Sequence, residues 1–445
     1  CLYQTRQFSL AEENYSRAAQ LSPSAGDYSI YQKGFLLGLQ KDYKGKISAM
    51  DRLISEYPES QYVDDALFEK GRSYVLLENS SSAAQAFEKL IREFPLSSLA
   101  RKAGIQLGLL YYNDNQPEKA LAAYKQVISN YPGSEEAKIA LQDLKSVYID
   151  LNDINAYASY VNSIGGNIRL EVGEQDSLTY IAAEKLFMRG DNDGARRSLI
   201  NYLQTFPEGA FSSNANFYLG SIAFAKKEFD EAIQRFKSVI ASGDTKFLEE
   251  SVARTAEIEY LSKDYPAALE SFKRLQIVAE NPENRQAARL GIMRCALQTG
   301  QQKDALLAAD ELLKEPKLSP ELEAEARYVR AKAYIAQKQA NKALADLKEL
   351  SKDTRTVHGA EAKYLLAQLY YDTNDDKNAE KVLMNFIENG TPHQYWLARG
   401  FILLADIRQG DDFQARQYLT SLQNNYKGDD DIAGMIENRL GKLKN

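Results

Sequence analysis

Cysteine, histidine, proline and glycine are all scarce in this chain. Among 445 residues there are two cysteines, Cys1 and Cys295, and two histidines, His358 and His393. Two cysteines cannot form a disulfide framework or a cysteine-rich metal cluster. With 11 prolines and 25 glycines, the composition excludes a collagen-like or low-complexity disordered chain. No apolar run approaches the roughly 18–20 residues that cross a bilayer, so we expect no transmembrane segment in this chain.

A concentration of positive charge is also missing. The chain has 55 lysines and arginines against 62 aspartates and glutamates, for a net charge of −7. The two signs are interspersed along the sequence, without the basic stripe that a phosphate backbone requires. The charge pattern therefore argues against nucleic acid as a partner. Hydrophobic residues make up 44% of the chain, which is enough for a large buried core.

Self-similarity at a fixed period is the strongest pattern that is present. Two kinds of residue recur every 37 residues over three consecutive units: Gly34, Gly71 and Gly108, and then Pro58, Pro95 and Pro132. A glycine lets a neighbouring helix approach closely, and a proline cannot continue a helix. Each unit is therefore predicted to be a pair of helices that ends at a proline-containing corner.

These units resemble the tetratricopeptide repeat (TPR) family, whose consensus has a small residue at position 8, aromatic residues at 11 and 24, alanine at 20 and proline at 32. The second unit matches it with Gly71, Tyr74, Ala83, Phe87 and Pro95. Position 20 can be followed along nearly the whole chain, at Ala11, Lys46, Ala83, Ala120, Tyr157, Ala195, Ala232, Ala268, Ala305, Ala343, Ala379 and Ala415. Lys46 and Tyr157 depart from the consensus alanine and indicate looser repeats. The resemblance implies an all-α fold: a right-handed α-solenoid of about 11–12 helix-turn-helix repeats of about 37 residues.

The regular period is interrupted once. Residues 162–175 contain Gly165-Gly166 and no helical periodicity, so they are predicted to form an irregular connector. This divides the chain into a first subarray at 1–161, with a truncated first repeat, and a second at 176–427. Asp176 or Ser177 is predicted to cap the first helix of the second subarray. Residues 428–445 are predicted to form a capping helix, with Asp429-Asp430-Asp431 as its N-cap.

Cys1 has two interpretations. An acylated cysteine begins bacterial lipoproteins, but a flexible polar tether would then follow it. The repeat register instead places Cys1 within a first helix, and the next residues read as the end of that helix and a turn. We therefore expect a chain that begins inside a longer protein, with a lipidated N-terminus as the alternative.

The sequence offers little for catalysis, and no cofactor or metal is expected. His358 and His393 occupy equivalent corners of successive repeats, too far apart for shared zinc ligation. Cys295 lies among apolar residues and is predicted to be a buried structural thiol rather than a nucleophile. The Asp429–Asp431 run lacks the alternating spacing and glycine of a calcium loop. We therefore expect that the protein is not an enzyme.

A partner-binding groove is implied by the TPR resemblance, because family members bind partners through positions 2, 5, 9, 12 and 13 of their first helices. Carried onto this sequence, these positions form an aromatic seam with isolated charges: Tyr31, Phe35, Phe68, Arg72, Tyr112, Tyr180, Phe187, Phe217, Phe224, Tyr260, Tyr328, Tyr364 and Tyr371, with Glu184, Glu257 and Lys332 at position 9. Exposed aromatic surface of this extent is typical of interaction sites. The alternative is that the rings only pack between repeats. Trp396, the single tryptophan, is expected to wedge between repeats, with a binding hot spot as the alternative.

The long period and the Tyr-Pro or Phe-Pro corners resemble large TPR proteins of the cell envelope in Bacteroidetes-type bacteria. A more distant likeness is to the TPR lipoprotein that serves the outer-membrane protein assembly machinery. These resemblances imply a non-catalytic scaffold that binds a partner protein in a periplasmic or outer-membrane-associated complex. A glycan-binding protein of a polysaccharide-uptake system is the main alternative. An RNA-binding repeat protein of the pentatricopeptide kind has a similar period but is disfavoured by the net charge.

Overall fold

The computed structural model describes residue 2 and residues 4–21, 25–165, 169–243, 246–408, 411–428 and 430–443. Over this part of the chain the regular secondary structure is entirely helical. The predicted all-α solenoid is therefore confirmed. The chain forms two compact units, Cys1–Ala215 and Asn216–Asn445, and each is described by itself.

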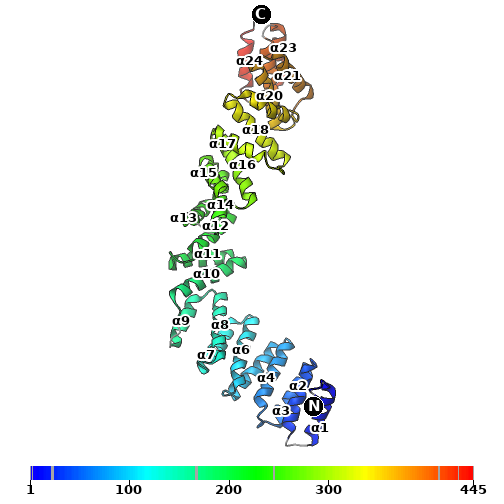
Figure 1. The fold of residues 1–445 in the computed structure, drawn as a ribbon, viewed down its shortest axis with the longest axis vertical. Helices are drawn as coiled ribbons and strands as arrows, with labels where there is room; N and C mark the ends of the chain where they lie inside the picture. The colour runs from blue at the N-terminus through cyan, green and yellow to red at the C-terminus, as the bar shows by residue number, and fades with distance from the viewer. Residues whose placement is uncertain are drawn as a thin grey trace. The chain divides into compact units, whose positions relative to one another are not determined.

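The first unit holds the helices α1 (Phe8–Leu21), α2 (Gly26–Leu39), α3 (Tyr43–Glu56), α4 (Val63–Leu76), α5 (Ser80–Glu93), α6 (Ser98–Asn113), α7 (Pro117–Asn130), α8 (Glu135–Asp150), α9 (Ile154–Ile164), α10 (Val172–Met188) and α11 (Asn192–Thr205) (Figure 1). Successive helices pack against each other, and α4, α6, α8 and α10 also contact one another in turn.

The second unit takes most of α12 (Ser212–Ala225) and holds α13 (Phe229–Ala241), α14 (Leu248–Leu261), α15 (Tyr265–Val278), α16 (Pro282–Gln298), α17 (Gln302–Leu312), α18 (Pro320–Ala336), α19 (Ala340–Leu350), α20 (Val357–Asp372), α21 (Asp376–Asn389), α22 (Gln394–Ile407), α23 (Asp412–Asn425) and α24 (Ile432–Leu440). We call the even-numbered helices α2–α22 the A helices and the odd-numbered helices the B helices. In the described residues, eleven A–B pairs follow α1 and precede α24.

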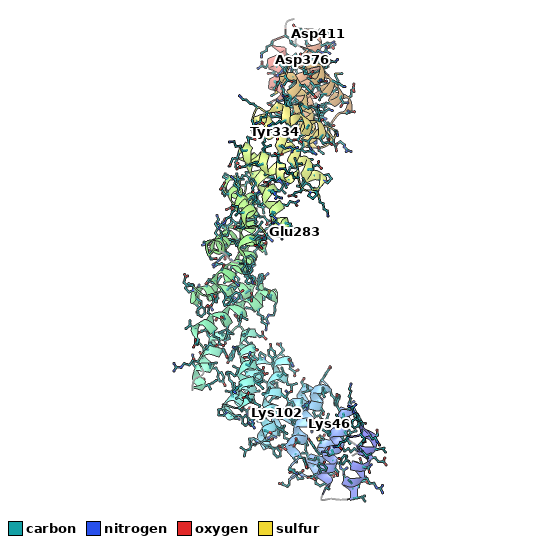
Figure 2. All side chains as sticks on the ribbon, viewed as in Figure 1. Lys46, Lys102, Glu283, Tyr334, Asp376 and Asp411 are labelled. Carbon is teal, nitrogen blue, oxygen red and sulfur yellow. The ribbon has the colours of Figure 1, made fainter. Side chains whose placement is uncertain are left out.

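The repeat register locates the B helices closely. Each of the twelve residues assigned to position 20, from Ala11 to Ala415, is the fourth residue of a B helix, and all twelve are buried. Lys46, labelled in Figure 2, keeps this register although it is not alanine. Its ammonium group pairs with Glu69 of α4. Tyr157 is also buried in α9 and packs against Tyr148.

The glycine at position 8 admits the ring at position 24 of the same repeat. A Cβ atom added to Gly71 would lie 2.5 Å from Phe87, and one added to Gly108 would lie 2.5 Å from Tyr124. Phe87 and Tyr124 are almost fully buried. The close approach predicted for these glycines is confirmed, and its contact is the aromatic ring of the partner helix.

The turn from A helix to B helix uses one residue in the left-handed region. Lys41 has φ 63° and Lys263 has φ 62°. This conformation lets the next amide bond back to the A helix, as Asp264 N donates to Glu259 O at 2.9 Å. The Asp264 carboxylate then caps the B helix by accepting from Ala267 N at 3.2 Å.

The predicted connector is shorter than expected. Helix α9 ends at Ile164 and α10 already begins at Val172, while residues 166–168, Gly166 among them, lie outside the described part. The prediction that Asp176 or Ser177 caps this helix is wrong, because both lie inside α10. Asp176 instead accepts hydrogen bonds from the Tyr202 hydroxyl at 2.5 Å and from Ala210 N at 2.9 Å. The division into subarrays at 1–161 and 176–427 stays a prediction.

Helix α24 follows the last A–B pair. Its Ile432 and Ile436 are buried against a cluster that includes Ala398 and Leu419, as a capping helix requires. Asp431 stands at the N-cap position but its side chain makes no capping hydrogen bond. Asp430, one residue earlier, accepts from Ile432 N at 3.0 Å. Asp429 and Cys1 lie outside the described residues.

Candidate functional site

All thirteen groove residues predicted from the sequence lie on A helices: α2, α4, α6, α10, α12, α14, α18 and α20. The structure does not leave their rings as a continuous open seam. Tyr180 and Tyr364 are buried, with exposed fractions of 2% and 6%, and the other rings are half-buried. Arg72 is exposed and pairs with Glu69 at 3.2 Å.

The rings at position 5 stack on rings that begin the next A helix. Tyr180 lies parallel to Phe211, with ring centroids 4.4 Å apart. Phe217 lies in the same way on Phe247, with centroids 4.1 Å apart. Offset or parallel ring pairs at such distances stabilise beyond the area that they bury. These pairs therefore join successive repeats.

The same stacking arrangement recurs in two other repeats, with different ring types. Tyr31 stacks on Tyr62 at 5.2 Å, and Tyr328 stacks on the imidazole of His358 at 4.3 Å. His358 is thus a corner residue, as expected. We call these four contacts, Tyr31–Tyr62, Tyr180–Phe211, Phe217–Phe247 and Tyr328–His358, the ring-stacked junctions.

Two further position-5 rings pack less regularly. Phe68 contacts Phe87 of its own repeat, with ring centroids 5.9 Å apart. Tyr364 lies 5.7 Å from the ring of Trp396, and its hydroxyl accepts from Arg399 at 3.0 Å. Trp396, on α22, therefore packs against α20 of the preceding repeat, as predicted from the sequence.

The rings at position 12 are held by polar and cationic neighbours. The Tyr112 hydroxyl donates to Asp150, and this bond, together with burial, raises the pKa of Tyr112 to about 12. Arg254 lies over the ring of Phe224, 4.9 Å from its centroid. At position 5, burial and then the charges of Asp65 and Glu69 raise the pKa of Tyr31 to about 12 as well.

One pair of neighbouring A helices encloses a cleft on this face. The α14–α16 cleft has a volume of about 380 Å³, with walls from α14 and α16 and a floor that includes Phe272 and Leu275 of α15. Its lining contains α14 residues at positions 2, 5, 9, 12 and 13: Glu250, Ala253, Glu257, Tyr260 and Leu261. Ala287, Leu290 and Arg294 line the opposite wall. The cleft therefore lies at the positions that the sequence assigned to partner contact.

The charged groups of the cleft pair with other protein groups. Arg254 bonds both Glu250 and Glu257, each at 2.9 Å. Arg294 makes two bonds of 2.7 Å to the Glu325 carboxylate of α18. The interior is left to aliphatic and aromatic side chains, which can bind an apolar group but present no acid–base pair.

Asn284, at the rim of the cleft, is held in place by Glu249. The Glu249 carboxylate accepts from the Asn284 amide at 2.7 Å and from the backbone N–H groups of Glu280 and Asn281. Burial raises the pKa of Glu249, but these three donors outweigh it and the net pKa is lowered.

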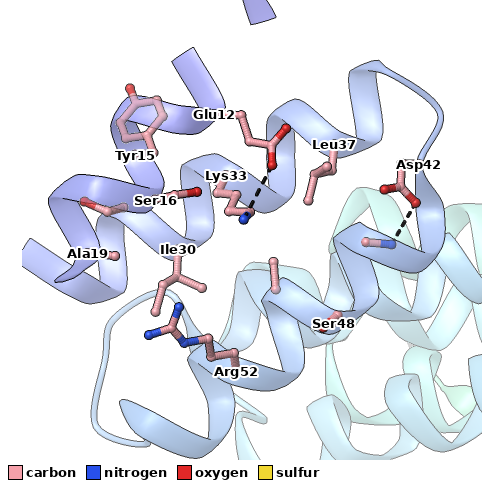
Figure 3. Close-up of a pocket in the computed structure, with 13 residues that line it drawn as sticks. Glu12, Tyr15, Ser16, Ala19, Ile30, Lys33, Leu37, Asp42, Ser48 and Arg52 are labelled. Atoms are coloured by element: carbon pink, nitrogen blue, oxygen red, sulfur yellow. Dashed lines mark hydrogen bonds and ion pairs between the residues drawn. The ribbon is translucent and has the colours of Figure 1, made fainter. Parts of the chain in front are cut away.

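Clefts between B helices differ in character. Figure 3 shows the one at α1–α3, with a volume of about 400 Å³. Lys33 and Glu12 form an ion pair there at 3.4 Å, and Asp42 accepts from Gly45 N. A second such cleft, between α5 and α7, has a volume of about 600 Å³ and is lined by Glu88, Arg92, Lys119 and Ala122 among others. These clefts are more polar than the α14–α16 cleft.

The remaining chemical candidates have structural contacts. Cys295 is fully buried, and burial raises the pKa of its thiol to about 11, which confirms the structural thiol. A ring nitrogen of His393 lies 3.0 Å from Arg355 O. Within the described ranges, no three histidine, cysteine, aspartate or glutamate side chains are grouped as a metal site. None of the described helices combines the length and apolar character needed to cross a membrane.

Two features of the face were missed by the sequence reasoning. The stacking partners Tyr62, Phe211, Phe247 and His358 follow their position-5 rings by 30 or 31 residues, so a search at that spacing would have found them. Ala253, at position 5 of α14, is smaller than Phe217 and Leu290, which hold that position in the repeats before and after it.

Comparisons with known proteins agree with the repeat architecture. Tetratricopeptide repeat models match residues 28–60, 182–245 and 360–389, and the chain therefore carries repeats of this type. An outer membrane lipoprotein family model matches residues 63–142. No curated protein matches the chain.

Solved structures resemble the chain at low identity. A structure of Naa15/Naa10 bound to HypK-THB has 12% identity and a TM-score of 0.42, covering 99% of this chain and 68% of that one. The TPR domain of P58(IPK) has 14% identity and a TM-score of 0.26, with coverages of 90% and 100%. The TPR2AB domain of yeast Sti1, in complex with pHSP90, has 12% identity and a TM-score of 0.29, with coverages of 61% and 99%.

Proposed function

We propose that this protein is a non-catalytic scaffold that binds a partner protein along the face formed by its A helices. One observation carries the proposal. Position 13 of the A helices presents a large apolar side chain to solvent in four repeats, at Leu39, Leu76, Met188 and Leu261, each with about half or more of its surface exposed. Exposed apolar residues that recur at one register position are typical of an interaction surface.

Exposed apolar residues on the B helices support this assignment by contrast. Ile277 and Leu307 are as exposed as the A-helix residues, but they occupy different positions of their repeats and form no periodic series. Scattered apolar residues of this kind are normal on a protein surface. The A-helix face is therefore the better candidate for a partner.

The ring-stacked junctions weigh against the glycan alternative. A sugar would need an accessible aromatic face. Here one face of the Tyr180 ring is covered by Phe211, and one face of the Phe217 ring is covered by Phe247. The apolar α14–α16 cleft fits a protein side chain better than a polyol. We accordingly favour a peptide segment as the ligand class.

We further propose that the scaffold belongs to a periplasmic or outer-membrane-associated complex of a bacterium of Bacteroidetes type. The match of residues 63–142 to an outer membrane lipoprotein family supports the envelope, and the corner phrases of the repeats suggest the bacterial group. Fractionation of the source cells should recover the protein with the envelope. Recovery with the cytosol alone would contradict the location without affecting the binding face.

Site-specific photo-cross-linking in the source cells tests the binding face. A photoreactive residue replaces Leu76 or Leu261 on the A helices, and Ile277 or Leu307 on the B helices as matched exposed controls. We expect the A-helix sites to yield adducts with a common partner and the B-helix sites to yield none of that partner. The proposal is wrong if the same adducts form equally from Ile277 and Leu307.

A further inference from the structure

The ring-stacked junctions show which side chains fill the space between neighbouring A helices. In the four ring-stacked junctions, the position-5 ring of one A helix is covered by a ring from the start of the next, with centroids 4.1–5.2 Å apart. Aromatic rings are therefore the group that this kind of junction is shaped to hold.

The α14–α16 junction has no aromatic ring at either of the two positions. Position 5 of α14 is Ala253, and the residue 31 positions later, where the covering ring would stand, is Asn284. Other junctions without a ring carry larger side chains at position 5, such as Ile105, Gln142 and Leu290. Ala253 and Asn284 both line the cleft of about 380 Å³.

Resting on the protein-binding function proposed above, we infer that the α14–α16 cleft binds one aromatic side chain of the partner segment. The ring enters between α14 and α16 and lies over Phe272 and Leu275, in the place that a ring of the chain itself fills at the ring-stacked junctions. Tyr260, whose ring centroid is 6.4 Å from that of Phe272 in an edge-to-face arrangement, supplies an aromatic side wall.

The charges around the cleft indicate that the inserted group is uncharged. Arg254 is shared between Glu250 and Glu257, and Arg294 is bound by Glu325. An inserted carboxylate or ammonium would have to displace one of these pairs and leave the other partner without its counter-ion. A phenyl or indole ring needs no such exchange, so Phe or Trp suits the site better than Asp, Glu, Lys or Arg.

A direct test uses N-acetyl-phenylalaninamide as the probe, with N-acetyl-leucinamide for comparison. Both are titrated into the whole chain with ¹³C-labelled leucine methyl groups, and the signals of Leu261, Leu275 and Leu290 are followed. We expect the aromatic probe to shift these signals with about three- to tenfold higher affinity than the aliphatic probe, the advantage of a ring–ring contact. Equal affinities, or shifts located elsewhere, would overturn the inference.

Two variants locate the effect. Ala253→Phe restores the missing internal ring and should abolish the shifts caused by the aromatic probe, and Ala253→Leu should weaken them. Ala122→Phe, which fills the B-side cleft between α5 and α7, should leave them unchanged. Binding that survives Ala253→Phe in a folded protein contradicts the proposal.

The two proposals fail in different ways. If Leu76 and Leu261 cross-link a partner while the aromatic probe does not bind the cleft, the binding face stands and the aromatic anchor is wrong. If the probe binds the cleft but cross-links form equally on B helices, the anchor site stands and the wider face is wrong.

Discussion

Two successive junctions of the second unit place different side chains at equivalent positions. Between α12 and α14, Phe217 and Phe247 stack with centroids 4.1 Å apart. Between α14 and α16, Ala253 and Asn284 take the same places and line an apolar cleft. The first junction uses its aromatic surface for packing, whereas the second leaves an opening of similar chemistry. Residues without rings at these two positions therefore leave open a space of the kind that a ring pair fills at the neighbouring junction.

Removing the ring from the stacked junction gives the largest expected effect. Phe217→Ala should lower the free energy of unfolding by about 2–4 kcal/mol, because a half-buried ring and its stacking contact with Phe247 are lost. Urea unfolding followed by circular dichroism measures it, with Phe217→Leu as a milder control. A loss below about 1 kcal/mol would show that the stack does not hold the repeats together.

Restoring rings to the cleft should act in the opposite direction. Ala253→Phe should raise the free energy of unfolding by about 0.5–1.5 kcal/mol, since it fills space with apolar contacts. Combined with Asn284→Phe, it should show a favourable coupling of similar size in a double-mutant cycle. If the pair is additive, the two positions do not face each other as in the stacked junctions.

Acid should loosen the cleft junction by a smaller amount. The net pKa of Glu249 is lowered, so its contribution is present above the ordinary glutamate pKa of about 4.3 and is lost as the pH falls through the lower folded value. Because Glu249 is only half-buried, we expect an effect below about 1 kcal/mol.

The measurement is the thermal midpoint between about pH 6 and pH 3 for the wild type and Glu249→Gln. The variant should show a weaker decline towards acid, because its amide cannot lose a charge. Glu250→Gln, one residue along α14, is the matched control. A decline steeper in Glu249→Gln than in the wild type would contradict the role given to the carboxylate.

Local and periodic features of the fold were predictable from the sequence. The position-20 residues located every described B helix, because that point of the helix is buried in each repeat and ten of the twelve residues there are alanine. Gly165 marked the end of α9, and the segment 428–445, predicted to be helical, contains the last helix.

Long-range partners were not predictable in the same way. Asp176 reads as a helix cap in the sequence, but it bonds Tyr202 and Ala210, 26 and 34 residues further on. The candidate site was predicted in part. Tyr260 was among the predicted groove residues. The cleft beside it was not predicted, because it depends on an alanine, Ala253, at a position where other repeats have an aromatic ring.

The proposed aromatic anchor is tested by selecting peptides from a random displayed library on the wild-type chain and then measuring their binding to Ala253→Phe and Ala122→Phe. We predict that the enriched peptides share an aromatic residue at one position. They should bind Ala122→Phe as tightly as the wild type and should not bind Ala253→Phe. Enriched peptides without a common aromatic residue, or peptides that bind a folded Ala253→Phe as tightly as the wild type, would show that the cleft does not bind an aromatic side chain.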